Sequence, residues 1–191
     1  MLNKLVLIAI LGVLGALLLS CDTENNSQTS YQWPIIEGFP KPQVPKDNPM
    51  SDAKVLLGKK LFFDKNLSAN QQQSCESCHF QAFAFAENRT VSQGSTGEAH
   101  RRNAPALVNI AYNKTLTWAH DGITTLERQI LIPMFSESPI ELGITGHEAK
   151  VLARFDTEAY QALFTQAFGD EPLSFELIVK ALASYVRSLI S

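Results

Sequence analysis

Two cysteines and a histidine stand together in Cys75-Glu76-Ser77-Cys78-His79, which has the C-x-x-C-H spacing of covalent haem attachment. Two thiols one helical turn apart can each add to a vinyl group on one edge of a porphyrin. The adjacent imidazole then lies under the iron as its proximal ligand. The motif therefore predicts one covalent haem c, attached through Cys75 and Cys78 with His79 on the iron.

The same cysteine pair has three other uses: a structural disulfide, a thioredoxin-like redox pair, or half of a zinc site. A redox pair requires a strand that leads into a helix, and a zinc site requires a second pair of ligands. The surrounding sequence offers neither pattern, so haem attachment is the favoured interpretation.

The sixth position on the iron has five candidate side chains in the sequence: Met50, His100, His120, Met134 and His147. Met134 lies in an apolar run, where a methionine is more often part of the core. His147 falls in the first turn of an expected helix and should be exposed, and His120 lies in an expected turn. His100, in the polar loop 94–103, is the preferred distal group.

The N-terminus has the pattern of an exported lipoprotein. Lys4 precedes the apolar run Leu5–Leu19, which ends abruptly at Ser20-Cys21. This run is too short for a comfortable membrane span, and its end resembles a bacterial lipobox. We expect a signal peptide over 1–20, lipidation of Cys21 and a periplasmic, lipid-anchored protein. A plain signal anchor with an incidental cysteine is the alternative.

The composition of the chain is that of a globular protein. The 191 residues are 45% hydrophobic and 18% charged, with a formal net charge of −3, which are ordinary values for a chain that buries a core. No basic run indicates nucleic-acid binding. Residues 21–48, rich in Asn, Gln, Ser and Pro, predict a flexible tether, and the haem domain is expected over 49–191.

Helix signals lie on both sides of the haem motif. Thr124–Glu127 has the form of a capping box and should open a helix that ends before Pro133. Residues 64–123 show turns and little regular period, and no segment alternates like a strand. The predicted fold is all-α and c-type cytochrome-like, with long irregular loops around the haem. The other expected helices are one capped by Ser51 with Ala53, Leu56, Leu57 and Leu61 on its buried face, one that opens with the same capping signal at Thr145–Glu148 ahead of Val151, Leu152 and Phe155, Thr157–Phe168 and Ser174–Ile190.

An ordered set of motifs resembles the bacterial di-haem cytochrome c peroxidases and their MauG relatives. The motifs are Leu57–Asp64, Ser74–His79, Arg102–Leu107, Ser138–Gly143 and the closing helix Ala181–Leu189. The resemblance covers residues 50–191. It implies a haem-dependent oxidoreductase that reduces hydrogen peroxide or oxidises a partner protein. Its electron donor would be a small cytochrome or a copper protein.

The resemblance also implies roles for four further residues. Glu141 and Gln129 match the distal carboxyl and amide: the carboxyl would move a proton of bound peroxide and the amide would hold the peroxide. Trp118 matches a tryptophan between the two haems, and Asn103 a residue near an inter-domain calcium ion. From the residues alone, Glu141 is a surface carboxylate, Gln129 a solvated helix residue and Trp118 a core aromatic.

The sequence departs from the family pattern in its distal loop. Many members carry a histidine there that ligates and releases the iron, but the matching position here is Ser95, and His100 lies next to Arg101 instead. The form Gly97–Asn103 looks closer to a MauG-like subgroup that oxidises residues of partner proteins.

The second departure is in length. The family continues into a second haem domain, whereas this sequence holds one haem motif and stops at Ser191. We expect a truncated product, a second domain on another chain or in a homodimer, or a single-domain derivative. The alternative function is a monohaem c-type cytochrome that acts only in electron transfer.

Overall fold

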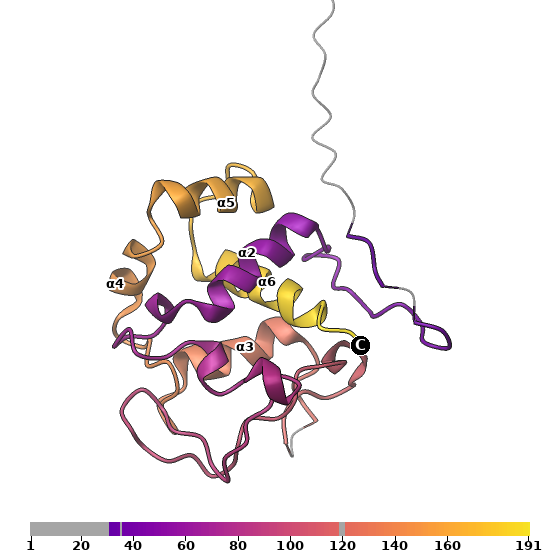
Figure 1. Ribbon diagram of the computed structural model, residues 1–191. Helices are drawn as coiled ribbons and strands as arrows, with labels where there is room; N and C mark the ends of the chain where they lie inside the picture. Colours follow the sequence, from indigo (N-terminus) through magenta and orange to yellow (C-terminus); the bar gives the residue numbers. More distant parts are fainter. Residues whose placement is uncertain (1–30, 35, 119–120) are drawn as a thin grey trace, which may run out of the picture.

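The computed structural model describes residues 31–34, 36–118 and 121–191, so that the expected signal peptide, Cys21 and His120 lie outside these residues. The described part is helical, with only isolated bridges as β-pairing, and the all-α prediction is confirmed (Figure 1). The elements are α2 (Asp52–Phe63), α3 (Leu126–Phe135), α4 (Glu148–Ala153), α5 (Glu158–Phe168), α6 (Phe175–Arg187) and the short 3-10 helices η1 (Lys65–Leu67), η2 (Cys75–Ser77), η3 (Gln81–Phe83) and η4 (Ile110–Tyr112). Within the described ranges, no helix is long and apolar enough to cross a membrane.

Three of the expected helices begin at side-chain caps, and Ser51 is the cap that the sequence predicts. The hydroxyls of Ser51, Thr157 and Ser174 each accept a hydrogen bond from a backbone N–H three residues later. Such caps satisfy donors that have no partner inside the helix. Four of the expected helices are therefore present, although α6 ends at Arg187 rather than at Ile190. The cap expected at Thr145 is wrong: α4 begins at Glu148 after His147, and the Thr145 hydroxyl donates to the carbonyl of Phe135 at 2.7 Å instead.

The capping box expected at Thr124 is wrong by one residue. The cap of α3 is Thr125, whose hydroxyl accepts from the N–H of Arg128. The Glu127 carboxylate does not turn back to cap the helix, because it is engaged elsewhere. It pairs with Arg187 of α6 at 2.8 Å and accepts a hydrogen bond from the Asn48 amide, also at 2.8 Å.

The end expected for α3 is also wrong, because the helix continues through Pro133 for two further residues. Proline lacks an N–H, so the carbonyl of Gln129 loses its partner within the helix. Contacts from outside hold the last turn in place: the carbonyls of Pro133 and Met134 accept from the N–H groups of Leu142 at 2.9 Å and Ile144 at 3.1 Å. These long-range bonds bring the segment around residue 141 beside α3.

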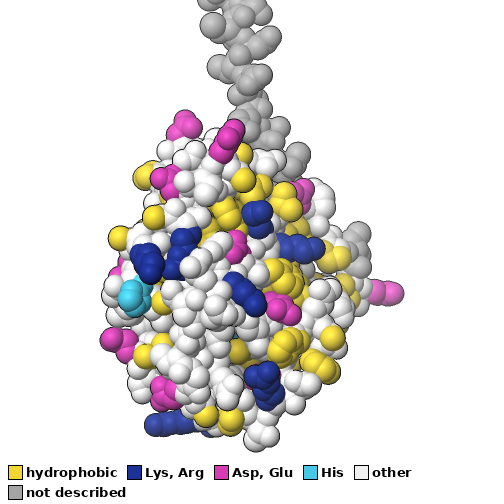
Figure 2. Space-filling view, turned by 60° about the vertical axis from the view of Figure 1, so that its left-hand side comes forward, with side chains coloured by type: hydrophobic (Ala, Val, Ile, Leu, Met, Phe, Trp, Pro, Cys, Tyr) yellow, Lys and Arg dark blue, Asp and Glu magenta, His cyan; other side chains and the backbone are white. Residues whose placement is uncertain are grey.

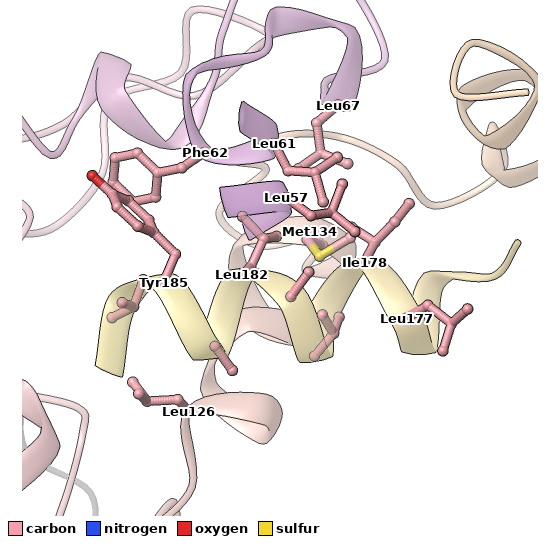
Figure 3. Close-up of a cluster of buried hydrophobic side chains, with 14 of the residues drawn as sticks. Leu57, Leu61, Phe62, Leu67, Leu126, Met134, Leu177, Ile178, Leu182 and Tyr185 are labelled. Atoms are coloured by element: carbon pink, nitrogen blue, oxygen red, sulfur yellow. The ribbon is translucent and has the colours of Figure 1, made fainter. Parts of the chain in front are cut away.

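The core lies where α2 packs on α6, with α5 on one side of this pair and α3 with the irregular segment on the other (Figure 1). Figure 3 shows Leu57 and Leu61 of α2 against Ile178 and Leu182 of α6, with Met134 of α3 among them. Leu56 was expected on this face, but its side chain is 54% exposed. One residue of helix turns the side chain by about 100°, so Leu56 points away while its neighbour Leu57 is fully buried.

Gly58 is the point of closest approach between α2 and α6. A Cβ atom at this position would lie 2.0 Å from the carbonyl oxygen of Ala181 and 2.6 Å from its carbonyl carbon. Both neighbours are backbone atoms, which cannot rotate aside. Only glycine therefore allows the two helices to pack this closely.

We expect Gly58→Ala to lower the free energy of unfolding by about 1–3 kcal/mol, because the helices must separate to admit the methyl group. Denaturant unfolding followed by circular dichroism measures the change. The matched control is Lys59→Ala, an exposed position in the same helix, which should change stability little. Equal stability of Gly58→Ala and wild type would show that the contact is not tight.

Arg154 ties the start of the irregular segment to the helical part. Its guanidinium donates to the carbonyls of Asn66 at 2.9 Å, Ser68 at 2.6 Å and Ala69 at 3.0 Å. Three carbonyls held by one side chain fix the path of the backbone just ahead of the haem motif.

The described part of the expected tether lies against the domain. The ring of Phe39 meets Tyr112 edge-on at 5.3 Å between centroids. Asn48 is fully buried, and its amide donates to the carbonyl of Lys180 at 3.0 Å as well as to Glu127. Asn48, just ahead of α2, therefore packs against both α3 and α6.

Candidate functional site

A cavity of about 500 Å³ lies between α3, α6 and the irregular segment. This volume is in the range of sites for small molecules and cofactors. Its walls are largely apolar, from helices and loops alike. The apolar side chains that line it include Phe62, Leu107, Ile110, Leu116, Leu126, Ile130, Ile132, Met134, Leu142, Leu182 and Val186.

All eight candidate site residues in the described part of the chain line this one cavity. They come from four separate stretches of sequence: Cys75, Cys78 and His79; His100 and Asn103; Trp118; and Gln129 with Glu141. Of the other expected iron ligands, Met134 lines the cavity but is 1% exposed within the core, and His147 is exposed, as expected. Met50 lies beside Arg187, with Nη1 4.0 Å from Sδ.

The two cysteines are presented by the short helix η2. The N–H groups of Cys78 and His79 both donate to the carbonyl of Cys75, at 3.3 and 3.0 Å. Neither thiol is in a disulfide. Burial raises the pKa of Cys75 to about 12 and that of Cys78 to about 11. A redox-active thiol pair would have a lowered pKa, so the environment argues against that use.

The imidazole of His79 is held from behind by a backbone carbonyl. Its Nδ1 lies 2.8 Å from the carbonyl oxygen of Phe85, within a tight turn in which the N–H of Phe85 donates to the carbonyl of Phe80. A carbonyl at Nδ1 favours the tautomer with the proton there and leaves Nε2 free to bind a metal. Burial lowers the pKa of His79 and keeps the ring neutral.

Other residues that line the cavity carry buried polar atoms without partners. His100 Nε2 and Gln129 Oε1 are buried and make no hydrogen bond. Burial raises the pKa of the Glu141 carboxyl, an effect that the nearby His100 partly offsets. Buried polar atoms normally have partners, so unpaired ones around a cavity indicate that a ligand completes the site.

Close packing of two loops places Glu141 in this wall. The N–H of Ser95 donates to the carbonyl of Glu141 at 2.8 Å. A Cβ atom on Gly94 would lie 1.7 Å from the carbonyl oxygen of Ile140, so a glycine is required there. Ser95, at the position where many relatives carry a histidine, does not line the cavity, whereas His100 does.

Trp118 forms the rim of the cavity and is 56% exposed, so it is not a core aromatic. Its Nε1 donates to the carbonyl of Asn103 at 3.2 Å, and the guanidinium of Arg102 lies over its ring at 5.6 Å from the centroid. The rim therefore holds a rigid, solvent-facing aromatic ring next to cationic side chains.

The residues present fit a covalently bound haem. The two thiols and an imidazole whose Nδ1 is held by a backbone carbonyl line the same cavity, and apolar side chains would enclose the porphyrin. A zinc site is not supported, because the described residues contain no group of three His, Cys, Asp or Glu side chains that could hold a metal ion.

The residue that sequence reasoning missed is Phe85. Its carbonyl orients His79 because Ala84 and Phe85 both have a positive φ, 57° and 58°. These are uncommon values for residues other than glycine. No glycine marks this turn, so the sequence carries no local signal for it.

Comparison with known proteins identifies the family. The family model described as di-haem cytochrome c peroxidase matches residues 52–191. The methylamine utilization protein MauG of Methylophilus methylotrophus is 34% identical over 171 residues, 87% of this chain and 49% of that protein. The cytochrome-c peroxidase IdrP1 of Denitromonas iodatirespirans is 34% identical over 175 residues, 90% of this chain and 44% of that protein.

A solved structure of a MauG-like protein associated with microbial copper homeostasis has the same fold, with 44% identity and a TM-score of 0.82 over 84% of this chain and 47% of that one. The chain thus spans about half the length of the relatives it matches. The ordered motifs, the all-α fold and the cysteine–histidine cavity agree with these matches. The chain belongs to the di-haem cytochrome c peroxidase family.

Proposed function

We propose that this domain is a haem-dependent oxidoreductase that carries one covalent haem c and reacts with hydrogen peroxide. Cys75 and Cys78 would form the thioether bonds, and His79 would be the proximal ligand. The observation that carries the proposal is that one cavity contains two thiols, a neutral imidazole, a buried carboxyl at Glu141 and buried polar atoms of His100 and Gln129 that have no partner.

The haem would supply an iron that binds peroxide and accepts electrons. The residues of the chain would move the proton, hold the peroxide and exclude water. The Glu141 carboxylate would take a proton from one peroxide oxygen and deliver it to the other, which leaves as water. Gln129 Oε1 would accept a hydrogen bond from bound peroxide. The apolar walls would exclude bulk water from the reaction.

Reduction of one hydrogen peroxide to two waters consumes two electrons and two protons. We propose that the electrons come from a small cytochrome or copper protein, or from residues of a partner protein that become oxidised in the reaction. Trp118, exposed at the rim, would relay electrons between the cavity and a second haem domain or partner. Calcium would bind beside Asn103 with ligands from that neighbour.

The alternative is a monohaem cytochrome that only transfers electrons. Such a carrier keeps its sixth iron position filled. The geometry favours the enzyme, because Met134 is buried among core side chains and the groups near Glu141 are those that handle protons.

The absorption spectrum of the ferric protein discriminates the two functions. We expect a high-spin spectrum and a rapid spectral change when hydrogen peroxide is added. A low-spin spectrum that peroxide does not change would favour the carrier and overturn the proposal.

We further propose that residues 1–20 are removed on export, that Cys21 is lipidated, and that a tether up to residue 48 joins the lipid to a haem domain over 49–191 on the periplasmic side. The support is the sequence pattern alone. Globomycin-sensitive maturation and incorporation of labelled palmitate are the corresponding tests.

His100 is the distal side chain whose role is most directly testable. Its Nε2 is buried and unpaired, so we expect it to hydrogen-bond to the ligand at the sixth iron position. A histidine bound to the iron itself would give a low-spin spectrum instead. His100→Ala should therefore alter the ferric spectrum while haem content is unchanged. His147→Ala is the matched control, since His147 is exposed at the start of α4. Identical spectra for all three proteins would remove His100 from the site.

A further inference from the structure

A cationic hollow with apolar walls lies at the end of α2, away from the haem cavity. It is shallow and open, with a volume of about 530 Å³. Leu56 and Phe63 are 54% and 38% exposed there. We define the α2 patch as Leu56, Lys59, Lys60, Phe63 and Lys65.

The α2 patch is positively charged on a chain whose formal net charge is −3. None of its lysines makes an ion pair among the described residues. Asp64, the one acid that lines the hollow, is engaged by the protein: its carboxylate accepts from the hydroxyl of Tyr160 at 2.6 Å and from the N–H of Asn66 at 2.8 Å. On the face in Figure 2, Lys and Arg side chains lie among hydrophobic ones.

Aromatic rings connect the α2 patch to the proximal side of the haem cavity. Phe63 packs edge-on against Phe62 at 5.3 Å, and Phe62 lies 6.4 Å from the ring of His79. Phe62 is 1% exposed. Tyr185 packs beside it at 5.2 Å between centroids, as Figure 3 shows. Two contacts between rings therefore connect the exposed Phe63 to His79, the proposed iron ligand.

We propose that the α2 patch is the docking surface for an acidic one-electron donor protein, and that Phe63, Phe62 and His79 form a second route for electrons into the haem site, separate from the one through Trp118. Each encounter oxidises the donor by one electron and reduces the haem site by one. Two encounters supply the electrons that one hydrogen peroxide consumes. Phenylalanine is hard to oxidise, so the rings serve as a packed tunnelling medium and not as radical carriers. The proposal rests on the function proposed above.

An acidic protein fits the α2 patch better than an anionic membrane does. The α2 patch has three lysines, whereas recognition of an anionic lipid surface usually uses clusters of about four to eight basic residues. Lys60 lies over the ring of Tyr160 at 5.1 Å from the centroid, and none of the three lysines makes an ion pair among the described residues. Such lysines around exposed apolar side chains give long-range steering together with a small contact area. Weak electron-transfer encounters use small interfaces of this kind.

The test uses the haem-loaded protein and cytochrome b5, an acidic one-electron haem protein, with basic mitochondrial cytochrome c as the control probe. Calorimetry at low ionic strength should detect binding of cytochrome b5 only. Lys59→Glu/Lys60→Glu should raise the dissociation constant by about tenfold or more, because attraction becomes repulsion. Lys41→Glu/Lys46→Glu makes the same change in net charge at exposed positions ahead of α2 and should leave binding unchanged.

Binding should also weaken as salt rises and be lost near 1 M, where the screening length is about 3 Å. Equal weakening by both double variants would overturn the proposal. So would failure of cytochrome b5 to bind while phosphatidylglycerol vesicles bind through Lys59 and Lys60, which would identify a membrane surface.

The electron route needs a variant that retains the binding. Phe63→Leu keeps the apolar wall but removes the ring, so cytochrome b5 should bind as before while its stopped-flow electron transfer to the ferric protein slows severalfold. An unchanged rate would overturn the route through Phe63. These readouts need no peroxide, so a protein that binds and accepts electrons here but does not react with peroxide would refute the proposed function and leave the docking surface standing.

Discussion

Replacing both Cys75 and Cys78 by alanine should abolish covalent haem, since each thiol would form one of the two thioether bonds. Haem staining of a denaturing gel measures this directly, because only covalent haem migrates with the polypeptide. Each single variant should keep one bond and stain more weakly. The control is Ser77→Ala, which changes a side chain of the same short helix without removing a thiol.

Loss of the haem should also destabilise the fold. A ligand that binds only the folded state stabilises it, and without one the cavity of about 500 Å³ leaves apolar walls unpacked. Thermal unfolding of the double variant should therefore begin at a lower temperature than that of the Ser77→Ala control. A double variant that still stains for haem would contradict the assignment of both cysteines.

The positions of the helices follow from local chemistry. Ser51 caps a helix as expected, and the helices expected from Thr157 and Ser174 begin at those residues, because one hydroxyl and the next three residues contain all the atoms that a cap needs. The errors arise where distant residues intervene. Glu127 leaves its expected capping role for Arg187, and α3 runs through Pro133 because bonds from residues 142 and 144 hold its end.

The candidate site likewise has one part that the local sequence predicts and another part that depends on distant residues. The thiols and His79 are adjacent in sequence, so their spacing alone predicts the attachment motif. The wall that contains Glu141 depends on contacts between loops: Gly94 must lie against Ile140, and Ser95 must bind the carbonyl of Glu141. These contacts join residues more than forty positions apart. From the residues alone Glu141 is a surface carboxylate, and only the family resemblance pointed to it.

Glu141→Gln should leave haem content unchanged and slow the reaction with hydrogen peroxide by about 10²–10⁴-fold, which is the usual contribution of a positioned acid–base group. The amide is similar in size and stays polar, but it cannot accept and return a proton. The measurement is the stopped-flow rate of the spectral change on mixing the ferric protein with peroxide. Glu137→Gln is the matched control, because Glu137 is exposed and lies in the same turn.

The pH dependence gives an independent check on the same group. Burial raises the pKa of Glu141 above its ordinary value, and the proposed step requires the ionised form. The rate for wild type should therefore fall as the pH drops through that raised pKa, and Glu137→Gln should behave in the same way. In Glu141→Gln the slow rate should lose this dependence, because the titrating group is absent. If Glu141→Gln reacts as fast as wild type and keeps the same pH profile, the proton transfer must be assigned to another residue.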